Sequence, residues 1–286
     1  MMSKFYNDAK TFVLLALLTV LILWIGAIMG GMRGVGMALI FATVGNFVSF
    51  FFSDRIAIAA MRGVEVGPEH PLFGIIEELA VRAKLPMPRV FISPHPAPNA
   101  FATGRNPKNA AVCATQGLLD MLNRNEISAV MAHELGHVKH RDILIQTVAA
   151  TIGAAIGWLG YVLMFSGGRD SEGRGNPFAM LAVFVLGPIA AFFIRTAISR
   201  SREFNADKEG AELCGDPMYL ASALEKIHLA AKRIPINVNP AFNSLFIAEP
   251  RNMIGSLASL FATHPPLQQR VMNLIGREST GIYQGI

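Results

Sequence analysis

The sequence predicts a mainly α-helical integral membrane protein that also carries a water-exposed α+β domain with a small β-sheet. Three observations lead to this fold class. Of the 286 residues, 52% are hydrophobic and only 16% are charged, whereas about 25% are charged in average soluble proteins. Uncharged apolar runs occur in two separate parts of the chain, and their lengths are close to the roughly 20 residues that a helix needs to cross a bilayer. Short strand-like segments with turn-forming residues between them lie between those two parts.

The first apolar part lies near the N-terminus. Residues 11–30 contain no charged residue, and a second apolar run over residues 35–52 follows after Arg33. The first run is longer than the apolar core of a signal peptide, which has about 7–15 residues. We therefore expect residues 1–53 to form a transmembrane hairpin of two helices that the protein retains.

The second apolar part consists of residues 143–165 and 178–194, which are uncharged and are separated by a glycine-rich polar turn. Their length and hydropathy predict that residues 143–198 form a second hydrophobic helix pair. Two alternatives stay open for this pair, namely long buried helices of the soluble domain and segments that enter the bilayer and return.

The distribution of basic residues predicts the orientation. Lys4 and Lys10 precede the first apolar run, and Arg33 lies in the turn that follows it. The positive-inside rule then predicts that both ends and residues 54–142 lie in the cytoplasm. We expect a multi-pass protein of the inner membrane. The net charge of +5 fits loops that face anionic lipid. Aromatic and basic residues are not interleaved as in nucleic-acid-binding proteins, so we expect no nucleic-acid partner.

The soluble part is expected to be one domain built from two separated pieces, residues 54–142 and residues 199–286. Apolar residues at helical spacing predict a helix over residues 71–84. Strands are predicted over residues 89–93, 99–103 and 110–115. Another helix is expected to begin near Asn125.

The segment His133-Glu134-Leu135-Gly136-His137 is the strongest chemical signal in the sequence. Residues four apart lie on one face of a helix, so His133 and His137 present two imidazoles to one point. Zinc accepts imidazole nitrogens, and this spacing supplies half of a tetrahedral site. Glu134 can reach a water at that site without binding the metal, which is the arrangement of hydrolytic zinc enzymes. The alternative is a surface helix with solvated side chains.

A third metal ligand is expected, because catalytic zinc usually takes three protein ligands and keeps one position open. Glu203 and Asp207 are also four residues apart. One of these carboxylates could bind zinc while the other orients a histidine ligand. On spacing alone, ordinary ion pairs with Arg200 or Arg202 are equally compatible.

Four further residues have non-catalytic interpretations that we favour. His140 and Asp142 follow the motif and could support a ligand, but we favour polar residues at the membrane interface. Cys113 and Cys214 are too few for a disulfide framework. We expect both to be buried thiols in a reducing compartment, with a disulfide between them left open.

The chain resembles the HtpX-type membrane zinc metallopeptidases, which are related to the prenyl-protein endopeptidases of eukaryotes. The resemblance covers nearly the whole chain and rests on several features in a fixed order. They are an N-terminal apolar hairpin, PNAFATG at residues 98–104, HELGH at 133–137, SRSREFNAD at 199–207 and THPPLQQR at 263–270.

This resemblance implies a zincin-like catalytic domain and assigns roles within it. His133 and His137 match the two histidine ligands of one zinc ion, Glu203 matches the third ligand, and Glu134 matches the general base. Asp207 matches an acidic position one turn after the third ligand, to which we assign the orientation of a ligand.

Three further residues gain roles from the resemblance. Asn99 lies in a segment that resembles an edge strand which pairs with the substrate backbone, a mode of binding that tolerates many side chains. His264 matches a histidine near the cleft and is a catalytic candidate for stabilising the oxyanion. Arg270 is a second candidate for that task, or a structural partner to an acid.

The function implied is a zinc-dependent endopeptidase that cleaves misfolded or damaged membrane proteins during quality control and the stress response. Its partners are then protein substrates and the lipid bilayer, and a homo-oligomer is left open. One alternative is the processing of prenylated proteins. Another is a metal-binding scaffold or transporter component without hydrolytic activity, although the four apolar segments lack the ionisable residues expected along a transport path.

Overall fold

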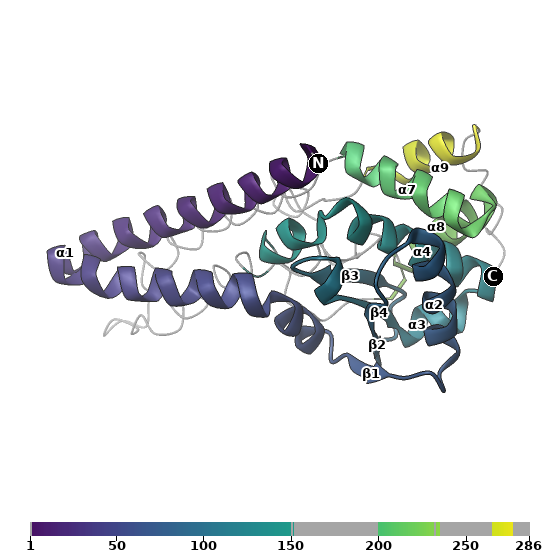
Figure 1. Ribbon diagram of the computed structural model, residues 1–286, viewed down its shortest axis with the longest axis horizontal. Helices are drawn as coiled ribbons and strands as arrows, with labels where there is room; N and C mark the ends of the chain where they lie inside the picture. The colour runs from purple at the N-terminus through teal and green to yellow at the C-terminus, as the bar shows by residue number, and fades with distance from the viewer. Residues whose placement is uncertain (1, 150, 152–199, 232, 235–264, 277–286) are drawn as a thin grey trace, which may run out of the picture.

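The computed structural model describes residues 2–149, 151, 200–231, 233–234 and 265–276 (Figure 1). The expected helix at 178–194, most of the expected helix at 143–165 and the candidate His264 lie outside these residues. The described part is mostly helical and contains one small mixed sheet, as the sequence predicted. Its elements are α1 (Met2–Ala60), β1 (Val64–Val66), α2 (Pro71–Ala83), β2 (Arg89–Ser93), β3 (Ala100–Gly104), η1 (Pro107–Asn109), β4 (Ala110–Thr115), α3 (Gln116–Met121), α4 (Arg124–His140), α7 (Arg200–Cys214), α8 (Pro217–Ala231) and α9 (Leu267–Ile275).

Helix α1 folds back on itself to form two antiparallel limbs that project from the rest of the molecule (Figure 1). Gly31 has a positive φ of 55°, which glycine adopts at little cost. The Asn46 side chain donates a hydrogen bond of 2.7 Å to Thr19 Oγ1, 27 residues earlier. In a straight helix these residues would be about 40 Å apart. The second limb runs without interruption to Ala60, past the expected boundary at residue 53.

The limbs of α1 expose an apolar surface. Gly31–Ala60 is, among the described residues, the one helical segment long and apolar enough to cross a membrane, and Ala9–Trp24 is a shorter apolar stretch. Large exposed side chains on the two limbs include Phe12, Trp24, Phe41 and Phe47. An exposed apolar area of this extent marks a surface that contacts lipid or another apolar partner.

The sheet has the strand order β1-β2-β4-β3, with β2 and β4 parallel and the two outer strands antiparallel to their neighbours. The predicted strands β2 and β4 have the expected limits, and β3 begins one residue later than expected. Strand β1 was not predicted, because a three-residue segment has no pattern of its own and is held by pairing with β2. Strand β3 is left as an edge of the sheet.

The two faces of the sheet are covered by different elements. Val90, Ala102 and Val112 face the main core, which the helices α2, α4 and α8 complete. Phe91, Phe101 and Cys113 face the end of α1 through Ala57, Ile58 and Met61. Each face of the sheet therefore packs against an apolar cluster, and the small sheet connects the apolar limbs to the helical core.

Cys113 and Cys214 are both free thiols. Cys113 is fully buried as expected, and this burial raises its pKa to about 12. Cys214 is only partly buried, so the expectation of full burial was wrong for this residue.

Helix α4 is defined at both ends and is nearly enclosed along its length. Asn123 and Glu126 form a reciprocal capping box at its start. Arg141 ends it in the left-handed conformation. Nearly every residue from Glu126 to Val138 is buried, including the charged ones.

Helix α7 packs closely along α4, because small residues meet at their contact. A Cβ atom at Gly210 would lie 2.9 Å from the backbone nitrogen of His133, and one at Gly136 would lie 3.3 Å from Cα of Ala206. The chain segments on either side of residues 143–198 thus come into direct contact where the predicted metal ligands lie.

Candidate metal centre

Helices α4 and α7 bring three potential metal ligands to one point. His133 and His137 come from α4, Glu203 comes from α7, and their candidate ligand atoms all lie within 4.8 Å of one another. His137 Nε2 is 3.5 Å from Glu203 Oε1, and His133 Nε2 is 3.9 Å from Glu203 Oε2. Ligands of a tetrahedral zinc ion, at about 2.0–2.1 Å from the metal, are about 3.4 Å from one another. The observed spacing therefore accommodates such an ion with small side-chain movements.

The surroundings of these ligands also favour a cation. All three side chains are at most 3% exposed. His133 Nε2 is buried and has no hydrogen-bond partner among the residues that the structure describes. A buried polar atom without a partner is costly, and a metal ion would satisfy it. Two imidazole nitrogens and one carboxylate are a ligand set that zinc accepts.

Each histidine ligand has a carboxylate behind its other ring nitrogen. His133 Nδ1 lies 2.9 Å from Asp207 Oδ1, and His137 Nδ1 lies 3.2 Å from Asp142 Oδ2. Carboxylates in this position fix the ring orientation and tautomer of a ligand and raise its basicity. The Nε2 atoms are consequently directed toward the third ligand on α7.

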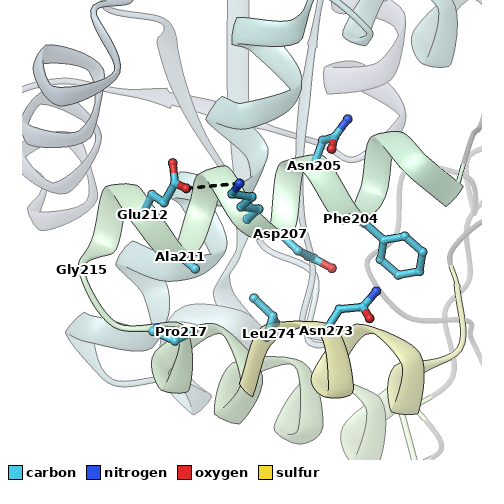
Figure 2. Close-up of a pocket in the computed structure, with 10 residues that line it drawn as sticks. Phe204, Asn205, Asp207, Ala211, Glu212, Gly215, Pro217, Asn273 and Leu274 are labelled. Carbon is cyan, nitrogen blue, oxygen red and sulfur yellow. Dashed lines mark ion pairs between the residues drawn. The ribbon is translucent and has the colours of Figure 1, made fainter. Parts of the chain in front are cut away.

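Arg270 anchors the carboxylate behind His133. It comes from α9, is 2% exposed, and donates from Nε and from a terminal nitrogen to Asp207 at 3.0 and 2.6 Å. Figure 2 shows Asp207 on the side of α7 that faces α9, beside a cavity of about 570 Å³. None of the three candidate metal ligands lines that cavity. Of the two roles considered for Arg270, that of structural partner to an acid matches this contact.

The carboxylates around the centre raise the pKa of one of its histidines, His137. Burial lowers the pKa of His137, but the negative charges of Asp142 and Glu203 outweigh burial and raise this pKa to about 10. In the absence of a metal ion, the raised pKa favours a protonated His137. Metal binding would displace that proton.

The ion pair behind His133 has its own pKa shifts. Burial raises the pKa of Asp207, but the guanidinium of Arg270 and the contact with His133 together outweigh burial and hold this pKa at about 2. Burial lowers the pKa of Arg270, but Asp207, with smaller contributions from Glu203 and Glu134, outweighs burial and raises it. Asp207 is therefore ionised at any pH at which the protein would function.

Glu134 lies beside the three ligands and is attached to the sheet. Its carboxylate is 6% exposed, and Oε2 accepts a hydrogen bond of 2.9 Å from the backbone N–H of Ala102. Ala102 is the middle residue of the edge strand β3. The carboxylate predicted to act as the base is thus held at the edge strand of the sheet, whose residues are all buried.

Asn99 directly precedes β3 and is fully buried. Its backbone N–H donates to Thr115 Oγ1 at 2.8 Å, and its carbonyl accepts from the Thr115 N–H at 2.9 Å. These bonds turn its backbone toward β4 rather than toward the outer edge. Its predicted contact with substrate stays a prediction, and His264 lies outside the described residues.

Asp142 is the residue whose importance the sequence interpretation missed. Its assignment to the membrane interface was wrong, because it is 1% exposed and lies against His137. Because Arg141 adopts the left-handed conformation, the Asp142 N–H donates a hydrogen bond of 3.2 Å to the His137 carbonyl.

His140 differs from Asp142, since its partly exposed ring is 3.7 Å from Glu209 on α7. Arg202, considered as an ion-pair partner for the α7 acids, lies 3.8 Å from Asp142.

Comparisons with known proteins agree with this geometry. The model of the family described as "Peptidase family M48" matches residues 69–278, more than half of the chain. A protease HtpX homolog of Syntrophotalea carbinolica is 49% identical over 275 residues, which cover 94% of this chain and 98% of the relative. A protease HtpX homolog of Ralstonia pickettii is 48% identical over 284 residues, covering 97% and 99%. The crystal structure of S. mikatae Ste24p shares the fold, with a TM-score of 0.51 and 18% identity, over 96% of this chain and 67% of that chain.

Proposed function

Because this chain belongs to peptidase family M48, we propose that it is a zinc-dependent endopeptidase that cleaves misfolded or damaged membrane proteins. Its membrane metalloprotease activity follows from the family and from relatives that match nearly its full length. The proposal adds zinc as the metal, damaged membrane proteins as the substrates, and His133, His137 and Glu203 as the ligands.

The observation that carries the proposal is the pairing of each histidine with its own carboxylate around a buried centre. Histidines that bind a metal almost always donate their other ring N–H to a carboxylate, a carbonyl or water, and here both rings face a carboxylate while both Nε2 atoms approach a third acid. Zinc bound there would supply Lewis acidity, which polarises a carbonyl and makes water a nucleophile near neutral pH.

Glu134 is the residue we propose for proton transfer. It accepts the proton of the attacking water and passes it to the leaving amine. The Ala102 N–H holds one of its oxygens at 2.9 Å and so limits its rotation. His264 stays our candidate for stabilising the oxyanion, and Asp207 and Arg270 act by orienting His133.

The position of Glu134 next to an edge strand supports the substrate class that we propose. A substrate segment that adds to the edge of β3, near Asn99, is held through its main chain, so its side chains matter little. Unfolded segments of membrane proteins meet this requirement. The apolar limbs of α1 keep the enzyme at the membrane, and we propose that residues 54–142 and 199–286 form the catalytic domain on the cytoplasmic side, with residues 143–198 as a second membrane pair.

The experiment compares the metal content and casein hydrolysis of the purified full chain in detergent with those of three variants. Glu134→Gln is expected to keep one zinc per chain while kcat falls about 10²- to 10⁴-fold, because only the base is removed. Glu203→Ala is expected to lose both zinc and activity. Glu212→Ala is the matched control, since Glu212 lies on the same helix but is exposed and paired with Lys208. Casein cleavage by Glu134→Gln at the parental rate would contradict the mechanism.

A further inference from the structure

A polar cavity of about 460 Å³ lies where the second limb of α1 reaches the sheet. Its lining includes four basic residues, Arg55, Arg89, Arg105 and Lys108, and one acidic residue, Asp54. We call it the basic cavity. Its volume falls within the range of small-ligand sites, about 300–1,000 Å³. It is separate from the metal centre, whose ligands lie on α4 and α7.

The basic cavity has an excess of positive charge that the protein does not neutralise. Asp54 is engaged by Arg89 at 2.7 Å. For Arg55, Arg105 and Lys108 the structure records no ion pair with any described residue. The Arg105 guanidinium stacks over the ring of Phe51 at 5.3 Å from its centroid, and Arg55 stacks over Phe52 at 5.4 Å. Stacking on aromatic rings fixes each guanidinium while leaving its N–H groups available to an anion.

The position of the basic cavity along α1 corresponds to the membrane surface. From Gly31, about 20 helical residues span the roughly 30 Å of a hydrocarbon core and end near Phe51. No charged residue occurs between Arg33 and Asp54. Phenylalanine rings therefore lie at the end of the apolar span, and Asp54 and Arg55 are the first charges beyond it. This is the depth of lipid headgroups.

We propose that the basic cavity binds the phosphate-bearing headgroup of an anionic phospholipid. The inference rests on the proposed membrane placement of α1 but not on peptidase activity. Arginine side chains suit phosphate because their planar N–H groups match its oxygens. Basic residues next to a membrane span attract anionic lipids in the same way. Arg105 and Lys108 lie in the turn between β3 and β4, so a bound headgroup would lie at the end of the strand whose Ala102 amide holds Glu134.

The test is a lipid titration of the full-length protein in detergent, followed by native mass spectrometry. The probes are phosphatidylglycerol, zwitterionic phosphatidylcholine and soluble glycerol 3-phosphate. We expect one phosphatidylglycerol to bind in preference to phosphatidylcholine, and glycerol 3-phosphate not to displace it. In the double variant Arg105→Gln, Lys108→Gln, binding is expected to weaken roughly 25-fold, since each cation contributes about five-fold.

The control is the double variant Arg124→Gln, Lys208→Gln, which removes the same charge from exposed residues away from the basic cavity. It is expected to bind phosphatidylglycerol as the parent does. Equal loss in both double variants would overturn the proposal, because the attraction would then depend on net charge alone. Displacement by glycerol 3-phosphate would overturn the lipid assignment in favour of a soluble phosphate. Casein hydrolysis, measured separately, keeps a failure of the proposed function distinct from either result.

Discussion

Helix α1 exposes many large apolar side chains and buries some polar ones, whereas α4 is buried almost throughout from Glu126 to Val138, the carboxylates of Glu126 and Glu134 included. On α1, Trp24 and Phe41 are more than half exposed, while Thr11 and Ser53 are buried. On α4, His133 and Glu134 are buried in the centre of the helical core. Neither pattern is that of an ordinary surface helix, which is apolar toward the core and polar toward water.

The contrast shows that each helix is matched to a different surrounding. The exposed surface of α1 is stable in lipid, because apolar side chains there lose nothing by facing outward. The buried charges of α4 are stable only with counter-charges, because an unpaired charge in the core is very costly. The structure supplies Lys226 against Glu126 and Arg270 against the neighbouring Asp207, and a metal ion would supply positive charge to the remaining carboxylates.

The largest effect is expected from removing Arg270, the buried cation that pairs with Asp207 behind His133. Arg270→Met should lower the free energy of unfolding by about 3–5 kcal/mol, because it leaves the buried Asp207 carboxylate without its partner. Chemical unfolding in detergent measures this loss. The control Arg124→Met breaks an exposed pair with Glu78 and should change stability by less than about 1 kcal/mol. Similar losses in both variants would show that α4 does not depend on matched buried charge.

The pH dependence sharpens the same prediction. Asp207 has its pKa held below the ordinary 3.8, at about 2. A depressed acid pKa stabilises the folded state fully above the ordinary value, and this stabilisation is lost as the pH falls through the folded value. The difference in stability between parent and Arg270→Met is therefore expected to be greatest at neutral pH and to shrink between about pH 4 and pH 2. A difference that grows in acid would contradict this assignment.

Those parts of the site that depend on local geometry were predictable from the sequence. His133 and His137 share a helix face because of the helical repeat alone, and strands β2 and β4 follow from their composition. Glu203 required the resemblance to a family, because spacing did not decide between its carboxylate and that of Asp207.

The parts that were not predictable depend on contacts between distant segments or on a single backbone angle. Asp142 reaches His137 only because Arg141 adopts a left-handed conformation with a φ of 59°. The resemblance offered Arg270 as a partner to an acid, but no periodic pattern shows that this acid is Asp207, 63 residues away. Strand β1 exists through its pairing with β2.

A smaller effect is expected from the carboxylate behind His137. Asp142→Asn keeps the shape of the side chain but removes its charge, so zinc affinity should fall about 10- to 100-fold. Competition with a chelator of known affinity measures the change. The matched control is Asp120→Asn, because Asp120 is exposed and bonds only to Gln116 in the contacts recorded for it. Unchanged zinc affinity in Asp142→Asn would remove Asp142 from the metal centre.

The smallest effect is expected in α1, where polar contacts contribute little in an apolar surrounding. Thr19→Val removes the acceptor of the 2.7 Å hydrogen bond from Asn46 that joins the two limbs, and such bonds between membrane helices average about 0.6 kcal/mol. Thr43→Val is the control, because among the described residues the Thr43 hydroxyl bonds to the Leu39 carbonyl of its own limb and not to the other limb. Unfolding titration in mixed detergent should detect a loss in Thr19→Val and almost none in Thr43→Val, with zinc content unchanged in both. A loss as large as that of Arg270→Met would mean that the limbs, like α4, depend on matched polar groups, and the contrast between the two helices would not hold.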